Sequence, residues 1–93
     1  MEENEHYLYV VCCKDDSLYA GYTNNLERRI KLHNEGKGAK YTRGRGPVEL
    51  VLSKKYATKS EALKAEYAFK QLKRNEKQQY IRKQGQYVAA EKL

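Results

Sequence analysis

The sequence of 93 residues has no tryptophan, one proline and two cysteines, and no apolar run approaches the roughly 18 residues of a membrane-spanning helix. The two cysteines, Cys12 and Cys13, are adjacent in a strand-like run. Strand alternation turns them to opposite faces, so a disulfide between them is geometrically poor. Residues 1–5 are mostly acidic, unlike a secretion signal. We therefore expect reduced thiols and a cytoplasmic protein with no membrane segment.

Charge is distributed unevenly along the chain. The first 25 residues hold one lysine and five acidic residues, a net charge of −4, whereas residues 26–93 hold 18 basic and 7 acidic residues, a net charge of +11. The length allows one domain, over residues 1–93. A basic surface on so small a domain favours a polyanion, such as a nucleic acid, as the partner.

Residues 7–22 have the pattern of a β-hairpin. Residues 7–13 are a continuous aromatic and β-branched run, typical of a central strand buried on both faces. Turn-forming residues follow at 14–17, and an extended pattern resumes at 18–22. The two strands should therefore pair in antiparallel fashion.

The length of the hairpin loop decides which tyrosines meet. A two-residue loop would pair Cys12 with Tyr19 and leave Tyr9 on the opposite face of the sheet. A three-residue loop would pair Val11 with Tyr19 and place Tyr9 and Tyr19 on one face. A shared site requires the three-residue loop.

Capping signals predict two helices. Asn24 with Glu27 suggests a helix that stops at Gly36, and Thr58 begins a second helix with a T-x-x-E capping box. Further elements, a third strand and a last helix, are expected at residues 48–53 and about 75–83. Residues 36–47 hold four of the six glycines, the only proline and a charge of +4, which predicts a mobile basic loop.

The first helix places a charge on its apolar face. At 100° per residue, Arg29 and His33 share the face of Leu26 and Ile30, whereas Arg28 points outward. An unpaired buried charge is costly, so Arg29 must pair with an acid or bind a ligand.

The second helix repeats this pattern with the opposite sign, because Glu66 falls within its apolar arc. Two interpretations are open. Glu66 and Arg29 could form an internal salt bridge that only stabilises the fold. Alternatively, Glu66 could be an oxygen ligand for Mg²⁺ while Arg29 holds a phosphate.

Together these residues resemble the GIY-YIG nuclease domain. The resemblance lies in the order and spacing of Tyr7-Leu8-Tyr9, Tyr19-Ala20-Gly21, the segment 25–29, His33 and Glu66. It covers roughly residues 6–75 and leaves a C-terminal helix and tail at 76–93. The segment 36–42 is similar to that of small stand-alone bacterial members and of structure-specific nucleases.

The resemblance implies an α+β fold, with a three-stranded antiparallel sheet flanked by helices, and a divalent-metal-dependent endonuclease that cuts DNA. It makes Glu66 the single protein ligand of Mg²⁺ or Mn²⁺, and it gives catalytic roles to Arg29, Tyr9 and Tyr19. The sequence departs from the family pattern at Tyr7, where the family has glycine, and at Ala20, where it has isoleucine. Neither change removes a reactive group.

The proton acceptor for the attacking water stays open among Tyr9, Tyr19 and His33. A tyrosine titrates near pH ~10, so as a base it needs a pKa lowered by nearby positive charge. Arg29 and the metal could supply that charge.

Further basic residues should contact phosphates without reading bases, so binding should be salt-sensitive and weakly sequence-selective. These residues are Lys37, Lys40, Arg43, Arg45, Lys70, Lys73 and Arg74. No residues remain for a separate DNA-binding domain, so we expect target choice to come from DNA structure, a protein partner or a homodimer. DNA repair or processing is the role suggested by analogy. The alternative is a non-catalytic nucleic-acid-binding module with the same fold.

Overall fold

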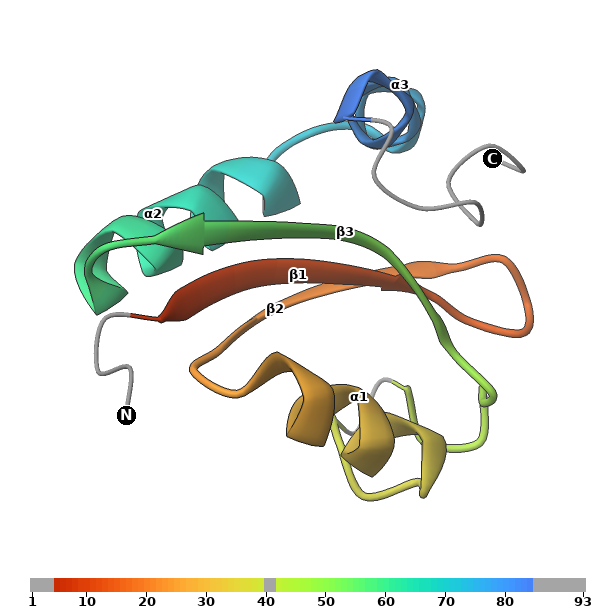
Figure 1. Cartoon of the computed structure of the whole chain (residues 1–93). Helices are drawn as coiled ribbons and strands as arrows, with labels where there is room; N and C mark the ends of the chain where they lie inside the picture. The colour runs from red at the N-terminus through yellow and green to blue at the C-terminus, as the bar shows by residue number, and fades with distance from the viewer. Residues whose placement is uncertain (1–4, 40–41, 85–93) are drawn as a thin grey trace.

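The computed structural model describes residues 5–39 and 42–84, and these form a three-stranded antiparallel sheet between helices (Figure 1). The strand order is β2-β1-β3, so the apolar first strand is central, as its composition predicts. The predicted α+β fold is confirmed. The elements are β1 (His6–Cys12), β2 (Leu18–Thr23), α1 (Leu26–Asn34), β3 (Glu49–Tyr56), α2 (Lys59–Lys70) and α3 (Arg74–Gln84).

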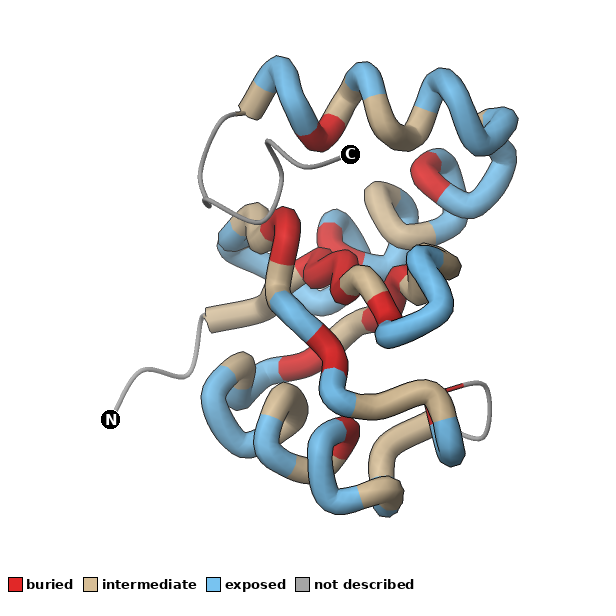
Figure 2. The backbone as a smooth tube through the Cα atoms, turned by 90° about the vertical axis from the view of Figure 1, so that its right-hand side faces the viewer, coloured by how far each residue is buried: buried red, intermediate tan, exposed pale blue. Residues whose placement is uncertain are grey.

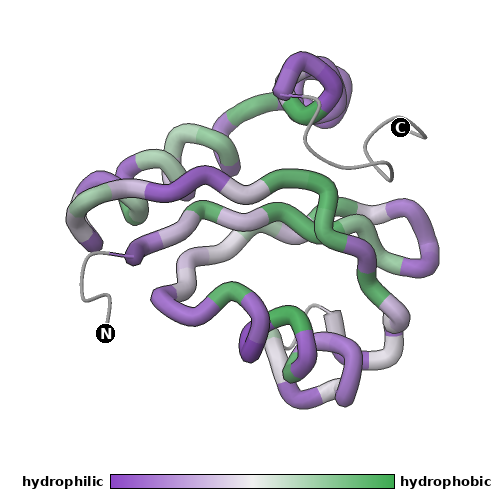
Figure 3. Tube along the Cα trace, in the orientation of Figure 1, coloured by the Kyte–Doolittle hydropathy of each residue, from purple (hydrophilic) through white to green (hydrophobic). Residues whose placement is uncertain are grey.

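Alternate residues of β1 enter two separate hydrophobic cores. Leu8 and Val10 pack against α2 and α3 through Phe69 and Ile81. Tyr9, Val11 and Cys13 face α1 instead and pack with Leu26 and Ile30. In Figure 2 most of the buried segments, in red, lie in the middle of the molecule. Figure 3 shows hydrophilic residues at the β1–β2 turn and along α3. In the described residues, no helix combines the length and apolar character needed to cross a bilayer.

The hairpin has the three-residue loop. Tyr9 pairs with Gly21 and Val11 pairs with Tyr19. The turn is closed by a 2.8 Å hydrogen bond from the Cys13 N–H to the Ser17 carbonyl, and Asp16 takes a left-handed backbone conformation at φ 70°. Tyr9 and Tyr19 therefore share the face that α1 covers.

The cap of α1 is one residue later than predicted. Asn25, and not Asn24, accepts the Arg28 N–H, at 3.1 Å. The physical reason is that the Thr23 hydroxyl accepts the Asn25 N–H at 3.0 Å and holds the chain in a turn before the helix begins. At α2 the predicted cap is confirmed, because Thr58 accepts the Glu61 N–H at 3.1 Å.

Candidate active site

Three aromatic rings from three elements meet on the α1 face of the sheet. The ring centres of Tyr9 and Tyr19 are 6.4 Å apart. The imidazole of His33 lies 5.6 Å from the first ring and 5.5 Å from the second. The three-residue hairpin loop, one of the two that the sequence left open, and the inward face of α1 thus bring Tyr9, Tyr19 and His33 together.

A hydrogen-bond chain fixes the direction in which these groups donate. The Thr42 hydroxyl donates to the Ala39 carbonyl at 3.0 Å, so its oxygen accepts from Nδ1 of His33 at 2.7 Å. A neutral imidazole then has its lone pair on Nε2, which accepts the Tyr9 hydroxyl at 2.8 Å. Tyr9, His33 and Thr42 are 2%, 0% and 1% exposed, so all three hydrogen-bonded side chains are buried and Tyr9 keeps a small accessible surface.

Two glycines make room for these rings. The Tyr9 ring lies across Gly21 of β2, where a Cβ would come within 2.7 Å of the Tyr9 hydroxyl oxygen. At Gly38 an added Cβ would collide with the His33 imidazole. The glycine of the Tyr19-Ala20-Gly21 motif is therefore required by its cross-strand neighbour, and the loop glycine by the close approach of the backbone to the ring.

Burial shifts the pKa values of Tyr9 and His33, the two titratable side chains of this hydrogen-bond chain, in opposite directions. Burial, assisted by the nearby Tyr19 phenol, raises the pKa of Tyr9, and the charge of Arg29 offsets this only in part. Burial also lowers the pKa of the His33 imidazole, and the charge of Arg29 lowers it further. Burial therefore works against the lowered pKa that a tyrosine base would need, and the charge of Arg29 does not by itself reverse this for Tyr9.

Arg29 and Glu66 both act on Tyr9, although they do not pair with each other. The charge of Arg29 lowers the pKa of Tyr9, and the charge of Glu66 raises it. The Glu66 carboxylate, 17% exposed, pairs with Lys70 at 2.8 Å. In the part of the chain that the structure describes, Arg29 makes no ion pair. The internal Arg29–Glu66 salt bridge is therefore not formed.

Lys70 joins the glutamate to the tyrosines. Its ammonium, bound to Glu66, also lies 5.8 Å from the centre of the Tyr19 ring. The sequence predicts only a phosphate contact for this lysine. The i, i+4 spacing of Glu66 and Lys70 on α2 is the signal that could have revealed the pair.

Several hydrogen bonds anchor the basic loop to the rest of the domain, among them one from the Lys37 N–H to the Leu32 carbonyl at 2.9 Å. Thr42, which no pattern in the sequence singles out, is held by His33. The Arg45 carbonyl accepts the Lys14 N–H at 2.8 Å. The Arg45 guanidinium pairs with Asp15 of the hairpin turn.

The remaining predicted phosphate contacts differ in their surroundings. Lys37, Arg43 and Lys73 are exposed. Arg74 is exposed as well, and its guanidinium donates to the Asp16 carbonyl at 2.8 Å. Lys40 lies outside the described residues.

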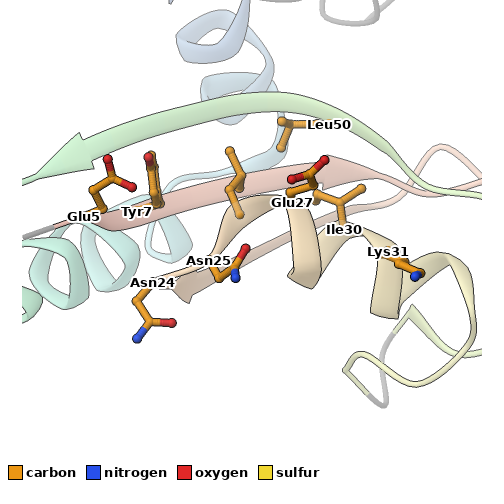
Figure 4. A pocket seen from close by; sticks show the side chains of 9 residues that line it. Glu5, Tyr7, Asn24, Asn25, Glu27, Ile30, Lys31 and Leu50 are labelled. Carbon is orange, nitrogen blue, oxygen red and sulfur yellow. The ribbon is translucent and has the colours of Figure 1, made fainter. Parts of the chain in front are cut away.

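A groove of about 860 Å³ lies beside the aromatic cluster and contains none of the predicted catalytic residues. Figure 4 shows it between the start of α1 and the strands β1 and β3, with Tyr7 and Leu50 on the strand side and Ile30 on the helix. Glu5 and Glu27 also line it. Lys31 lines it as well, and Glu5 pairs with Lys55 at 3.3 Å, so the groove carries charges of both signs.

The three-stranded antiparallel sheet, with Tyr9 and Tyr19 on one of its faces, agrees with the domain that the motif spacing predicted. Residues 5–80 match the GIY-YIG catalytic domain family. The chain belongs to the GIY-YIG family.

Relatives of similar length share most of the chain. A UPF0213 protein of Bacillus velezensis is 62% identical over 81 residues, which are 87% of this chain and 82% of that protein. A UPF0213 protein of Bacillus cereus is 54% identical over 93 residues, 100% of this chain and 97% of that one. The solution NMR structure of a UPF0213 protein from Bacillus halodurans matches with a TM-score of 0.61 at 48% identity, covering 92% of each chain.

The buried, neutral His33 should make the fold sensitive to acid. In the unfolded chain this imidazole binds a proton near pH ~6.5, whereas the folded protein holds it neutral to lower pH. Below that pH the unfolded state binds more protons, so the free energy of unfolding should fall as the pH falls. Urea unfolding at pH 7 and pH 5 measures this. In a His33→Gln variant the free energy of unfolding should differ less between the two pH values. Equal differences in the variant and the parent protein would contradict a buried, neutral His33.

Proposed function

We propose that this protein is a divalent-metal-dependent endonuclease that hydrolyses DNA phosphodiester bonds with little sequence specificity, in DNA repair or processing. The observation that carries the proposal is the buried hydrogen-bond chain that ends at Tyr9, within reach of the charges of Arg29 and Glu66. Membership of a nuclease family supports phosphodiester chemistry at this site.

Arg29 is suited to bind the scissile phosphate. Its side chain is half-buried on α1, and among the described residues it has no carboxylate partner. A guanidinium in this position offers paired donors to phosphoryl oxygens, and it offsets the negative charge that develops on them during attack.

Tyr9 and His33 together form a base that neither provides alone. The raised pKa of Tyr9 disfavours a free phenolate. The neutral imidazole, however, presents a lone pair at Nε2 to the Tyr9 hydroxyl. Tyr9 would therefore take a proton from the attacking water while its own proton passes to Nε2 of His33. Nδ1 stays bonded to Thr42 throughout, which keeps the ring in place.

Glu66 is the group that would hold the metal ion. The described residues contain no cluster of three His, Cys, Asp or Glu side chains, so a protein-only cage is absent from them. A single carboxylate still fits Mg²⁺ or Mn²⁺, because Mg²⁺ commonly keeps several waters and takes one or two carboxylates plus phosphate oxygens. When bound, the ion supplies positive charge to the phosphate and to the leaving oxygen. Lys70, bound to the same carboxylate, competes with the ion for it.

The exposed lysines and arginines supply the sequence-independent contacts. Lys37, Arg43 and Lys73 are exposed and would bind backbone phosphates, with affinity that falls as salt rises. Such contacts do not read bases, so target choice has to come from DNA shape, a protein partner or a second copy of the chain.

Replacing Glu66 with alanine should abolish cleavage and leave DNA binding nearly unchanged, because the carboxylate holds the metal and makes no favourable contact with phosphate. The measurement uses labelled single-stranded, duplex, flapped and branched DNAs with Mg²⁺, with Mn²⁺ and with a chelator. Glu61→Ala removes an exposed carboxylate of the same helix and should cut like the parent protein.

Salt-dependent binding without cutting by the parent protein would contradict the nuclease and favour a non-catalytic binding module. Equal cutting by the parent and by Glu66→Ala would exclude Glu66 as the metal ligand.

Tyr9→Phe and His33→Gln should each lower kcat by about 100-fold or more, the usual contribution of general acid–base catalysis. Because the two residues move one proton along one path, the double variant should be no slower than the single ones. Single-turnover cleavage at saturating DNA measures these rates. Tyr22→Phe removes a hydroxyl bonded to His6 and should leave kcat unchanged. Losses that multiply in the double variant would show independent roles and reject the relay.

A further inference from the structure

The outward side of α2 exposes an apolar surface between lysines. Leu63 and Tyr67, one turn apart, are 42% and 69% exposed, although large hydrophobic residues are usually covered. They line a shallow groove of about 530 Å³. The α2 groove consists of Lys59, Ser60, Leu63, Lys64 and Tyr67.

The charge of the α2 groove suits a polyanion. Lys59 and Lys64 have no carboxylate partner among the described residues. The Lys59 ammonium instead lies 5.6 Å from the centre of the Tyr22 ring, a contact that leaves its charge available to a phosphate. A basic peptide, or a second copy of this chain with its net charge of +7, would meet unfavourable charge in the same place.

The groove adjoins the proposed metal ligand on the helix surface. Tyr67 follows Glu66 directly and is turned about 100° from it, and Leu63, three residues earlier, is turned about 60° from Glu66. Lys70 lies one turn beyond Glu66 and contacts Tyr19. A strand that passes the site can therefore continue along the groove. Figure 1 shows α3 beyond the C-terminal end of α2, away from the first half of this helix.

We infer that the α2 groove binds a single-stranded segment of the substrate beside the cleavage site, with a base stacked on Tyr67 and phosphates on Lys59 and Lys64. The inference rests on the proposed nuclease function and specifies its substrate as DNA with a single-stranded arm. An exposed aromatic ring among lysines is the combination that binds single strands, because an unpaired base has a free face. In a duplex both faces of an internal base are already stacked.

The absence of tryptophan from the chain allows a direct test. Tyr67→Trp introduces a single indole, and stacking of a base on it should quench its fluorescence strongly. The probe is an unlabelled oligothymidine, compared with a blunt duplex of equal length, with a chelator present to prevent cleavage. We expect the single strand to quench more than half of the emission and the duplex to quench much less. Gln79→Trp, at an exposed position of α3, should show little quenching with either.

Affinity provides a second readout that needs no cleavage. Tyr67→Ala should weaken binding of the single strand by about fivefold or more, and Tyr67→Phe should restore it, since stacking uses the ring and not the hydroxyl. Duplex affinity should change less than twofold. The side chain is largely exposed, so neither variant should lose its fold.

Two results would overturn the inference. The first is binding of the single strand without quenching of Tyr67→Trp. The second is a concentration-dependent blue shift of that indole without DNA, which would assign the groove to a second copy of the chain. If either result is found while metal-dependent cutting is intact, only the inference about the α2 groove is rejected and the nuclease proposal stands. Quenching without any cutting would retain the groove and reject the nuclease.

Discussion

The hydrogen-bond chain from Tyr9 through His33 to Thr42 is the interaction on which the rest of the site depends. It joins the central strand, the first helix and the basic loop through buried groups. Breaking such a chain leaves donors or acceptors without partners in a region shielded from water, which costs more than the bonds themselves contribute. The close packing of Gly21 on the tyrosine and of Gly38 on the imidazole follows from the same arrangement.

This constraint also sets the chemistry of the site. Burial holds the phenol protonated and the imidazole neutral, so the proton order runs in one direction, from phenol to imidazole to threonine. Arg29 and Glu66 approach the chain from helices on opposite sides of the sheet. Because Glu66 pairs with Lys70 and not with Arg29, the Arg29 guanidinium is available for a phosphate.

The helices and strands could be predicted from the sequence because their periodicity determines the side to which each side chain points. The helical period placed Arg29 and His33 inward. The strand period placed the two tyrosines on one face only for a three-residue hairpin loop, and the register of the structure selects that loop. Thr42 and Gly38 lie in an irregular loop without periodicity, so their contacts with His33 had no sequence signal. The cap of α1 was missed because Asn24 and Asn25 are equally good caps, and only the Thr23 hydroxyl selects between them.

The most direct test of this organisation is the protonation state of His33 at pH 7, read from the ¹⁵N chemical shifts of its ring. The hydrogen-bond chain requires a neutral imidazole with its proton on Nδ1, donated to Thr42, and an unprotonated Nε2 that accepts from Tyr9. That spectrum, unchanged down to pH values below ~6.5, is the expected result. An imidazolium at pH 7, or a neutral ring with its proton on Nε2, would contradict the hydrogen-bond chain from Tyr9 to Thr42 and the proton relay that depends on it.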